Sequence, residues 1–385
     1  MSEYQYYEFQ TIDRQLTAAQ MQQLRRYSSR ADITATRFVN EYHWGDFKGD
    51  PDEWMDRYFD AFLYFANWGT RTLMLRLPAA LLSPRVARDY CDGNTLALRA
   101  KASHVVLTFH LDADGGDHEM PDDAGLLSSL VALRSHLGRG DLRALYVGWL
   151  AIAQNGDLDD DAIEPPVPPG LGQLDDSLEA LVAFLRIDAD LLEVAAQASP
   201  APPAAPSQKE LADWIATLAV AEKDRILTRL VAEPDDHSAA SELAQRFHAT
   251  RDKGAPAAPE SRRKVGTLLE TADRTTAERT QAEAAKAAAE QARREREAAE
   301  ARVRHLDRLA GQEQRLWSEL EGLIATRLPK NYDLALQHLI DLRDLAARSG
   351  EQGRTDFAAR LAGLRALHAR KPSLLERLGR VGASP

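Results

Sequence analysis

The chain has 385 residues, of which 44% are hydrophobic and 28% are charged, and its formal net charge is -11. This length allows two or three domains of ordinary size, and the composition is typical of a folded protein with at least one hydrophobic core. Because Cys91 is the only cysteine, an internal disulfide and a thiolate-rich metal site are excluded, and we expect a cytoplasmic location.

The charge is unevenly distributed along the chain. Up to Ser199 there are 17 basic and 31 acidic side chains, whereas the remainder has 31 basic and 28 acidic ones. An acidic front half is a poor surface for nucleic acid, because phosphate contacts require basic groups, so nucleic acid is an alternative partner for the basic tail alone. Neither a signal sequence nor a run of roughly 20 apolar residues is present, so no membrane contact is predicted.

Residues 1–198 predict an acidic α+β domain. Asp50, Pro51 and Glu53 form a helix start, and we expect this helix to continue to about Ala66. The expected strands are Tyr4–Ile12, Phe38–Trp44, Thr72–Leu77, Leu96–Ala100 and His104–Leu111, the last two forming a pair. The other expected helices are Thr17–Ser28, Leu126–Leu137, Asp141–Gln154, Asp175–Leu185 and Ala189–Gln197, with Asp141, Asp175 and Asp188 as N-caps.

Two linkers rich in Pro and Ala, 199–207 and 252–260, enclose a small helical block at 208–251, which opens with a Ser207/Glu210 capping box. Residues 261–327 predict one long helix with a coiled-coil seam, and 330–385 predict a helical hairpin tail. The seam positions, in alternating steps of three and four, are Ala282, Ala285, Ala289, Ala292, Arg296, Ala299, Val303, Leu306, Ala310, Glu313, Trp317, Leu320 and Ile324. Leu306, Trp317, Leu320 and Ile324 are the expected anchors of an interaction, either with a second copy or within one chain.

The stretch from Tyr42 to Asp50 (YHWGDFKGD) is the candidate recognition turn. Trp44, Asp46 and Lys48 share a glycine-bearing loop, and loops on a rigid scaffold commonly carry recognition. The alternative is a turn whose tryptophan is buried as an anchor.

Other motifs predict no catalytic, cofactor or metal site. The acidic loop Asp112–Asp123 lacks the glycine and the final glutamate of a calcium-binding EF-hand loop, and His104 and His110 are too far apart on a strand to ligate one ion. Cys91 has no nearby histidine in the sequence, and no phosphate-cradling loop is present. The arginines of residues 293–304 alternate with glutamates, which is typical of a solvated helix surface.

Three segments of the front half, YQYYEFQTIDRQLT, FVNEYHWGDFKGDP and YFDAFLYFANWGTRTLMLRLP, resemble an uncharacterised bacterial family of predicted cytoplasmic proteins. The likeness extends to GDLRALYVGWLAIAQ and IEPPVPPGL. The tail segments YDLALQHLIDLRDLAARSG and LRALHARKPSLLERL are similar to a helical segment of bacterial proteins of the SWIM zinc-finger group. One cysteine cannot supply the SWIM zinc ligands, so the resemblance implies no activity and only a partner role near nucleic-acid-associated machinery.

The leading prediction is therefore a non-enzymatic cytoplasmic interaction protein with a protein partner, in which a coiled-coil rod connects an acidic recognition domain to a helical docking tail. A nucleic-acid-associated accessory protein is the first alternative, because the tail is basic. A metal-dependent hydrolase built on the acids and histidines of the front half is the last alternative.

Overall fold

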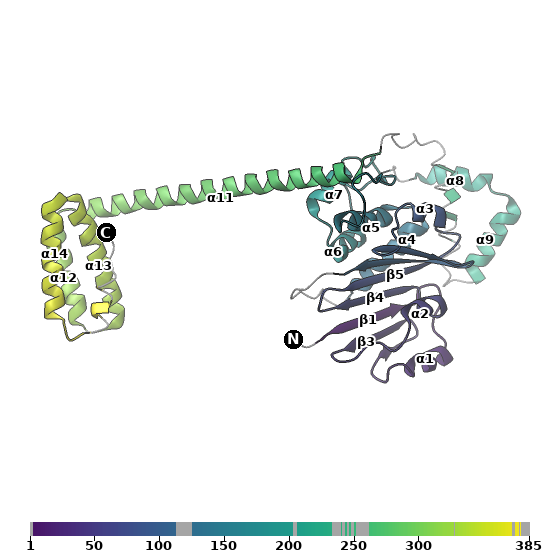
Figure 1. Ribbon diagram of the computed structural model, residues 1–385, viewed down its shortest axis with the longest axis horizontal. Helices are drawn as coiled ribbons and strands as arrows, with labels where there is room; N and C mark the ends of the chain where they lie inside the picture. The colour runs from purple at the N-terminus through teal and green to yellow at the C-terminus, as the bar shows by residue number, and fades with distance from the viewer. Residues whose placement is uncertain are drawn as a thin grey trace. The chain divides into compact units, whose positions relative to one another are not determined.

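The computed structural model describes residues 3–112, 125–202, 206–232, 240, 243–244, 246–247, 250–251, 262–326, 328–371, 374–376 and 378. The chain divides into two compact units, Met1–Arg279 and Thr280–Pro385 (Figure 1). The predictions for the acidic loop after Asp112, for the linker 252–260 and for part of the helical block before it lie outside the described residues.

The first unit is built on a seven-stranded antiparallel sheet with the order β2-β3-β1-β4-β5-β7-β6 (Figure 1). The strands are β1 (Gln5–Gln10), β2 (Asp32–Ile33), β3 (Arg37–Tyr42), β4 (Ala61–Ala66), β5 (Arg71–Pro78), β6 (Leu96–Ala100) and β7 (His104–Leu111). The predicted α+β class and the predicted pairing of the last two strands are confirmed. Among the described strands, the central ones have neighbours on both sides, and β2 and β6 lie at the edges.

The predicted helix from Asp50 to about Ala66 is wrong beyond its first two turns. Helix α2 spans Pro51–Arg57, and the Asp50 carboxylate caps it by accepting two amide hydrogen bonds. Residues Ala61–Ala66 form β4, in which every side chain except that of Tyr64 is buried. A central strand that is covered on both faces is apolar throughout, so its sequence cannot be distinguished from a buried helix by periodicity.

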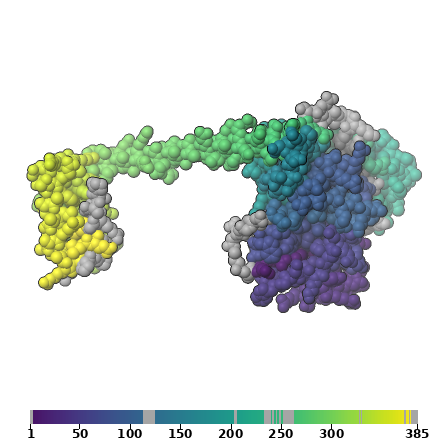
Figure 2. Space-filling model, in the orientation of Figure 1, coloured from purple at the N-terminus to yellow at the C-terminus, as the bar shows by residue number. Residues whose placement is uncertain are grey.

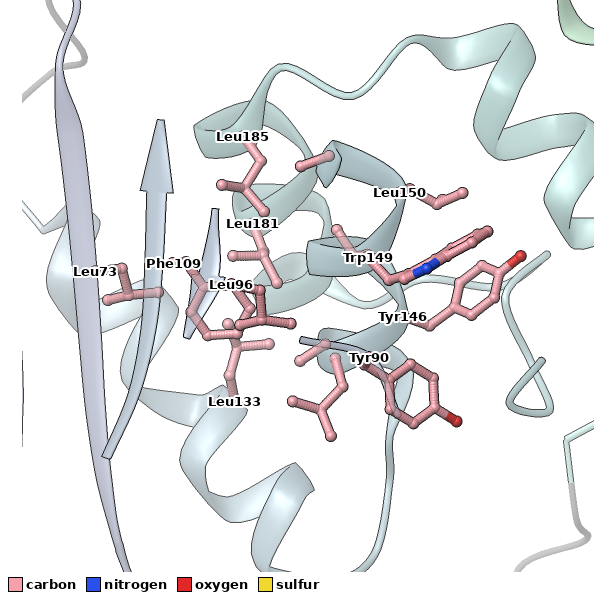
Figure 3. Packing of buried hydrophobic residues seen from close by; sticks show 14 of the residues in the cluster. Leu73, Tyr90, Leu96, Phe109, Leu133, Tyr146, Trp149, Leu150, Leu181 and Leu185 are labelled. Carbon is pink, nitrogen blue, oxygen red and sulfur yellow. The ribbon is translucent and has the colours of Figure 1, made fainter. Parts of the chain in front are cut away.

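Alternate residues of the sheet enter two cores on opposite faces. The larger core lies on one face and includes residues of five helices, which are α3 (Pro84–Arg88), α4 (Leu126–Gly138), α5 (Arg143–Gln154), α6 (Asp176–Leu185) and α7 (Ala189–Ala196). Figure 3 shows Leu133, Leu181 and Leu185 from these helices beside Leu96 and Phe109 of the sheet. Helices α1 (Ala18–Arg25) and α2 cover the other face, whose core is dominated by aromatic rings. Such rings contribute the largest apolar area per residue to a core.

Helix capping follows the sequence closely in this unit. Asp175 and Asp188 accept amide hydrogen bonds at the starts of α6 and α7, as predicted. Helix α5 begins one residue later than predicted, at Arg143 with Leu142 at the cap position. The Asp141 carboxylate still acts at this helix start, because its Oδ1 accepts a hydrogen bond from the Arg143 amide at 3.1 Å, and it also pairs with the Arg143 side chain at 2.7 Å.

Helices α8 (Gln208–Thr217) and α9 (Val220–Ala232) contribute no residue to either core of the sheet, and the chain then returns to the larger core at Val265. At the departure, the Ser199 hydroxyl donates to the Pro168 carbonyl and the Gly170 amide donates to the Pro200 carbonyl. At the return, Lys264 forms an antiparallel bridge with Ile163. Both ends of the excursion are therefore attached to one short segment, and the block 208–251 is an insertion into the first unit.

Helix α11 (Val265–Leu309) begins inside the first unit. Val265, Leu268 and Ala272 belong to the larger core, and the side chains of Thr276 and Arg279 bond the buried carboxylate of Asp190. The first turns of the predicted rod are thus part of the front domain, which explains why the first unit extends to Arg279.

The second unit differs from the predicted single helix over 261–327. Helix α11 ends at Leu309, Gly311 adopts φ 79°, and α12 (Glu313–Ala325) follows. Glycine adopts a positive φ at no steric cost, so the chain can reverse here. Helices α13 (Pro329–Arg348) and α14 (Gly350–Leu367) complete one apolar cluster with α12 and the end of α11. Within the described residues, no helix is both long enough and apolar enough to cross a membrane.

Candidate functional site

The candidate recognition turn, residues 42–50, follows β3 directly. Gly45 adopts φ 80°, which allows the chain to reverse immediately after Trp44. The Trp44 side chain is 84% exposed, the most exposed large hydrophobic residue among those described. The alternative of a buried tryptophan anchor is therefore wrong for Trp44, and a neighbouring ring, that of Phe47, takes the anchoring place.

The turn is held firmly although its tryptophan is exposed. Gln5 Nε2 donates to the Gly45 carbonyl at 3.0 Å, and the Phe47 amide donates to Asp46 Oδ1 at 2.7 Å. The Phe47 ring packs against Tyr7, with centroids 5.0 Å apart, and against the buried Trp54 ring. Asp46, predicted as a contact residue, thus braces the turn.

A hydrogen-bonded cluster lies beneath the turn on the same face of the sheet. The Tyr7 hydroxyl is 2.8 Å from Asp46 Oδ1 and 2.9 Å from Gln5 Oε1, so its single proton is donated to one of the two. Tyr64, which faces Tyr7 across β1 and β4, donates to Gln5 Oε1 at 3.2 Å. Burial, reinforced for Tyr7 by the bond to Asp46, raises the pKa of Tyr7, and burial raises the pKa of Tyr64 to about 12. Both phenols are therefore protonated donors near neutral pH.

The polar side chains of Tyr7 and Tyr64 belong to a row that continues across the sheet with Thr72 of β5 and His110 of β7. Thr72 Oγ1 is 3.0 Å from His110 Nδ1, and His110 Nε2 is 3.2 Å from Asp112 Oδ2. This order of groups resembles a nucleophile, base and orienting acid. However, Thr72 is 9% exposed whereas the Asp112 side chain is 73% exposed, so the group that would have to reach a substrate is the most shielded one. Thr72 is therefore a poor candidate for a nucleophile, and the side chains of this row stabilise the end of the sheet.

Lys48 of the recognition turn is exposed and pairs with no described side chain.

The four predicted anchors of the seam are buried in the second unit. Leu306, Trp317, Leu320 and Ile324 are 4%, 5%, 0% and 0% exposed. They pack with α13 and α14 inside one chain, so they supply a core and no accessible surface. By contrast, the seam positions from Ala282 to Ala299 are all exposed, and the middle of α11 is uncovered on the face visible in Figure 2.

The remaining motifs have structural roles. His104 pairs with Asp56 at 2.9 Å, away from the His110 row, and the described residues contain no cluster of three or more potential metal-ligating His, Cys, Asp or Glu side chains. Burial raises the pKa of the Cys91 thiol to about 12, which makes it a poor nucleophile. On α11, Arg293 and Arg294 both pair with Glu290, as expected for a solvated helix surface.

Comparisons with known proteins found no match: no protein-family model, no curated protein and no solved structure matches the chain. The resemblances of the front half and of the tail stay predictions. The cluster of Gln5, Tyr7 and Tyr64 was missed from the sequence, because it depends on the strand register. The available signal was the strand periodicity of two, which places Gln5 and Tyr7 on the same face of the predicted strand.

Proposed function

We propose that this protein is a non-enzymatic adaptor whose first unit binds a partner protein through the turn at residues 42–50. The observation that carries the proposal is that Trp44 is 84% exposed on a turn whose next two residues, Gly45 and Asp46, contact Gln5 and Tyr7 of β1. Tryptophan is enriched among the residues that dominate binding energy at protein interfaces. A turn that is already ordered loses little conformational entropy on binding, which favours affinity.

The partner should offer an apolar pocket for the indole with an acidic rim. Lys48 lies four residues after Trp44 on the same turn and is exposed, so its ammonium is available to a carboxylate of the partner. Asp46 is already engaged with Tyr7 and contributes by holding the turn. Contacts at a charged rim mainly affect the association rate, and the buried aromatic anchor carries the affinity.

The test is a pull-down from native lysate with the full chain, comparing the wild type with Trp44→Ala. Trp68→Ala is the matched control, because Trp68 is 40% exposed on the neighbouring β4–β5 turn. We expect the first variant to lose one specific protein and the control to retain it. If both variants capture the same proteins in the same amounts, recognition does not use this turn.

The second unit supplies the other docking element of the adaptor, and α11 offers a surface for self-association. If two copies pair along the seam in parallel, the flanking Glu295 of one helix faces Glu300 of the other, and Arg296 faces its own copy. In an antiparallel pair with Arg296 opposite Ala299, each Arg293 faces the Glu300 of the second helix. Charge therefore favours the antiparallel arrangement. The alanines bury little area, so we expect a weak dimer.

A charge exchange tests this arrangement through sedimentation velocity. Glu300→Arg places like charges opposite Arg293 in an antiparallel dimer and weakens it, and adding Arg293→Glu restores it. In a parallel dimer the same Glu300→Arg change removes a repulsion and strengthens pairing. A wild type that stays monomeric at high concentration would exclude both arrangements.

A further inference from the structure

Strand β6 lies at an edge of the sheet, and every second residue of it turns its backbone groups away from β7. The Lys101 amide donates to β7 at 2.8 Å, and the Thr95 carbonyl accepts from β7 at 2.8 Å. Residues that bond to the neighbouring strand alternate along an antiparallel pair with residues that do not. The amides and carbonyls of Leu96, Leu98 and Ala100 therefore point outward from the edge.

The outward groups of Leu96 already have partners. Its amide donates to Asp92 Oδ1 at 2.9 Å, and its carbonyl accepts from the amides of Asp92 and Gly93. Within the part of the chain that the structure describes, no group bonds to the outward amides and carbonyls of Leu98 and Ala100. Ala100 is exposed and Leu98 is half-buried, so this end of the edge is open to solvent.

An open edge of this kind is a template for another strand, because its donors and acceptors match those of any extended backbone. We propose that β6 binds an extended segment of another protein, which pairs with Leu98 and Ala100 as an added strand of the sheet. The proposal does not rest on the turn at residues 42–50, which follows β3 near the opposite edge of the sheet.

Charge makes a second copy of this chain a poor occupant of the edge. In an antiparallel pair of two β6 strands, Leu98 opposite Ala100 places Arg99 against the Arg99 of the other copy. Ala100 opposite Ala100 places Arg99 against Lys101. Like charges directly opposite one another are destabilising. Leu98 opposite Leu98 requires Leu96 to pair, and the backbone groups of Leu96 are already bonded.

The side chains beside the edge define the chemistry of the segment. On the face of the larger core, Leu98 is half-buried, and Val86 of α3, a helix that contacts β6, is 40% exposed. On the other face, Lys101 is half-exposed and shares the Asp56 carboxylate with Arg99. Successive side chains of an added strand point to opposite faces. The segment should therefore be apolar toward the first face and acidic toward the second.

The probe is a short fluorescein-labelled peptide in which valine alternates with glutamate, titrated with the full chain and followed by fluorescence anisotropy. We expect binding, and weaker binding when lysine replaces glutamate. Methylating the backbone nitrogens of one alternate set of residues, the set that faces β6, should abolish binding, whereas methylating the other set should not. Hydrogen exchange measured by mass spectrometry should show new protection of residues 96–101 in the complex.

The matched variants are Ala100→Pro and Ala102→Pro. The first removes one outward amide but leaves the bonds of β6 to β7, so it should fold and should weaken peptide binding by about fivefold or more. The second lies in the turn after β6 and should bind as the wild type does. Trp44→Ala should also bind the peptide normally, which separates this edge from the recognition turn.

Three results would overturn the proposal. The first is that the wild type binds none of the peptides. The second is that both methylated peptides bind equally and residues 96–101 gain no protection, a result that does not depend on the folding of any variant. The third is that Ala100→Pro abolishes a wild-type dimer in sedimentation velocity, which would identify a second copy as the occupant.

Discussion

Arg263 donates two parallel hydrogen bonds to the Glu164 carboxylate, from Nε to Oε2 at 2.8 Å and from Nη2 to Oε1 at 2.7 Å, although 99 positions separate the two residues. Glu164 is 2% exposed and also accepts a hydrogen bond from Tyr146. This pair closes the first unit immediately before α11 begins. Paired and fully hydrogen-bonded charges are tolerated inside a protein, whereas one of them left alone is not.

Arg263→Ala should therefore lower the free energy of unfolding of the first unit by about 3 kcal/mol, because it leaves the Glu164 carboxylate buried without a partner. Chemical denaturation followed by tryptophan fluorescence measures this change. The neighbouring exposed Arg262 is the control, and its substitution by alanine should have little effect. Equal losses for the two variants would contradict a special role for the pair.

Gly148→Ala tests the close packing of α5 on the sheet. A Cβ atom at this position would lie 2.8 Å from Leu96 Cδ2 and 3.0 Å from Phe109 Cε1. Overpacking of this kind costs about 1–3 kcal/mol, so we expect a lower denaturation midpoint. Gly172→Ala is the control, because nothing lies within 4 Å of its added Cβ.

Leu320→Ala distinguishes a core within one chain from a seam between chains. Leu320 is fully buried in the second unit, so the substitution should lower the free energy of unfolding of this unit by about 3 kcal/mol. If the core belongs to one chain, the melting temperature of this unit does not change with protein concentration. Val303, which is 48% exposed on the same seam, provides the control substitution to alanine. A melting temperature that rises steeply with concentration would place these residues between chains.

The lowered pKa of Asp56 leads us to expect a loss of stability in acid. Burial alone would raise the pKa of Asp56, but hydrogen bonds from Arg99, Lys101 and His104 lower it well below its ordinary value. A carboxylate with a lowered folded-state pKa stabilises the fold at pH values above about 4, and this contribution disappears as the pH falls through the folded-state pKa.

The corresponding variant is Asp56→Asn. We expect it to cost about 2 kcal/mol at neutral pH, the usual size for hydrogen bonds to a charged group, and the difference from the wild type should shrink below about pH 4. Denaturation midpoints measured from pH 3 to pH 7 provide the readout. Asp89→Asn, at an exposed position, should shift the midpoints little at any pH.

Local signals in the sequence predicted much of the fold. The capping residues Asp50, Asp175, Asp188 and Ser207 all act at helix starts, because capping involves only neighbours in the chain. The break at Gly311 had a visible signal, a glycine inside an otherwise helical pattern, but the seam register continued across it.

The features that escaped prediction are non-local. Asp46 was recognised on the correct turn, yet its bond to Tyr7 depends on the pairing of β1 with β3, which a single sequence does not specify. Trp44 could be singled out as a candidate, but the packing of the half-buried Phe47 ring against Tyr7 shows which ring of the turn anchors it.

The attachment of both Pro200 and Lys264 to residues 160–171 has a consequence for how this chain can vary. The free-energy cost of closing a chain excursion grows only slowly with its length, by roughly 0.6 kcal/mol for each doubling. The α8–α9 insertion can therefore be lengthened, shortened or exchanged for another module while the start of α11 stays docked on the first unit through Arg263 and Val265. A reporter domain placed between Pro200 and Arg262 would leave the path from the sheet into the long helix uninterrupted.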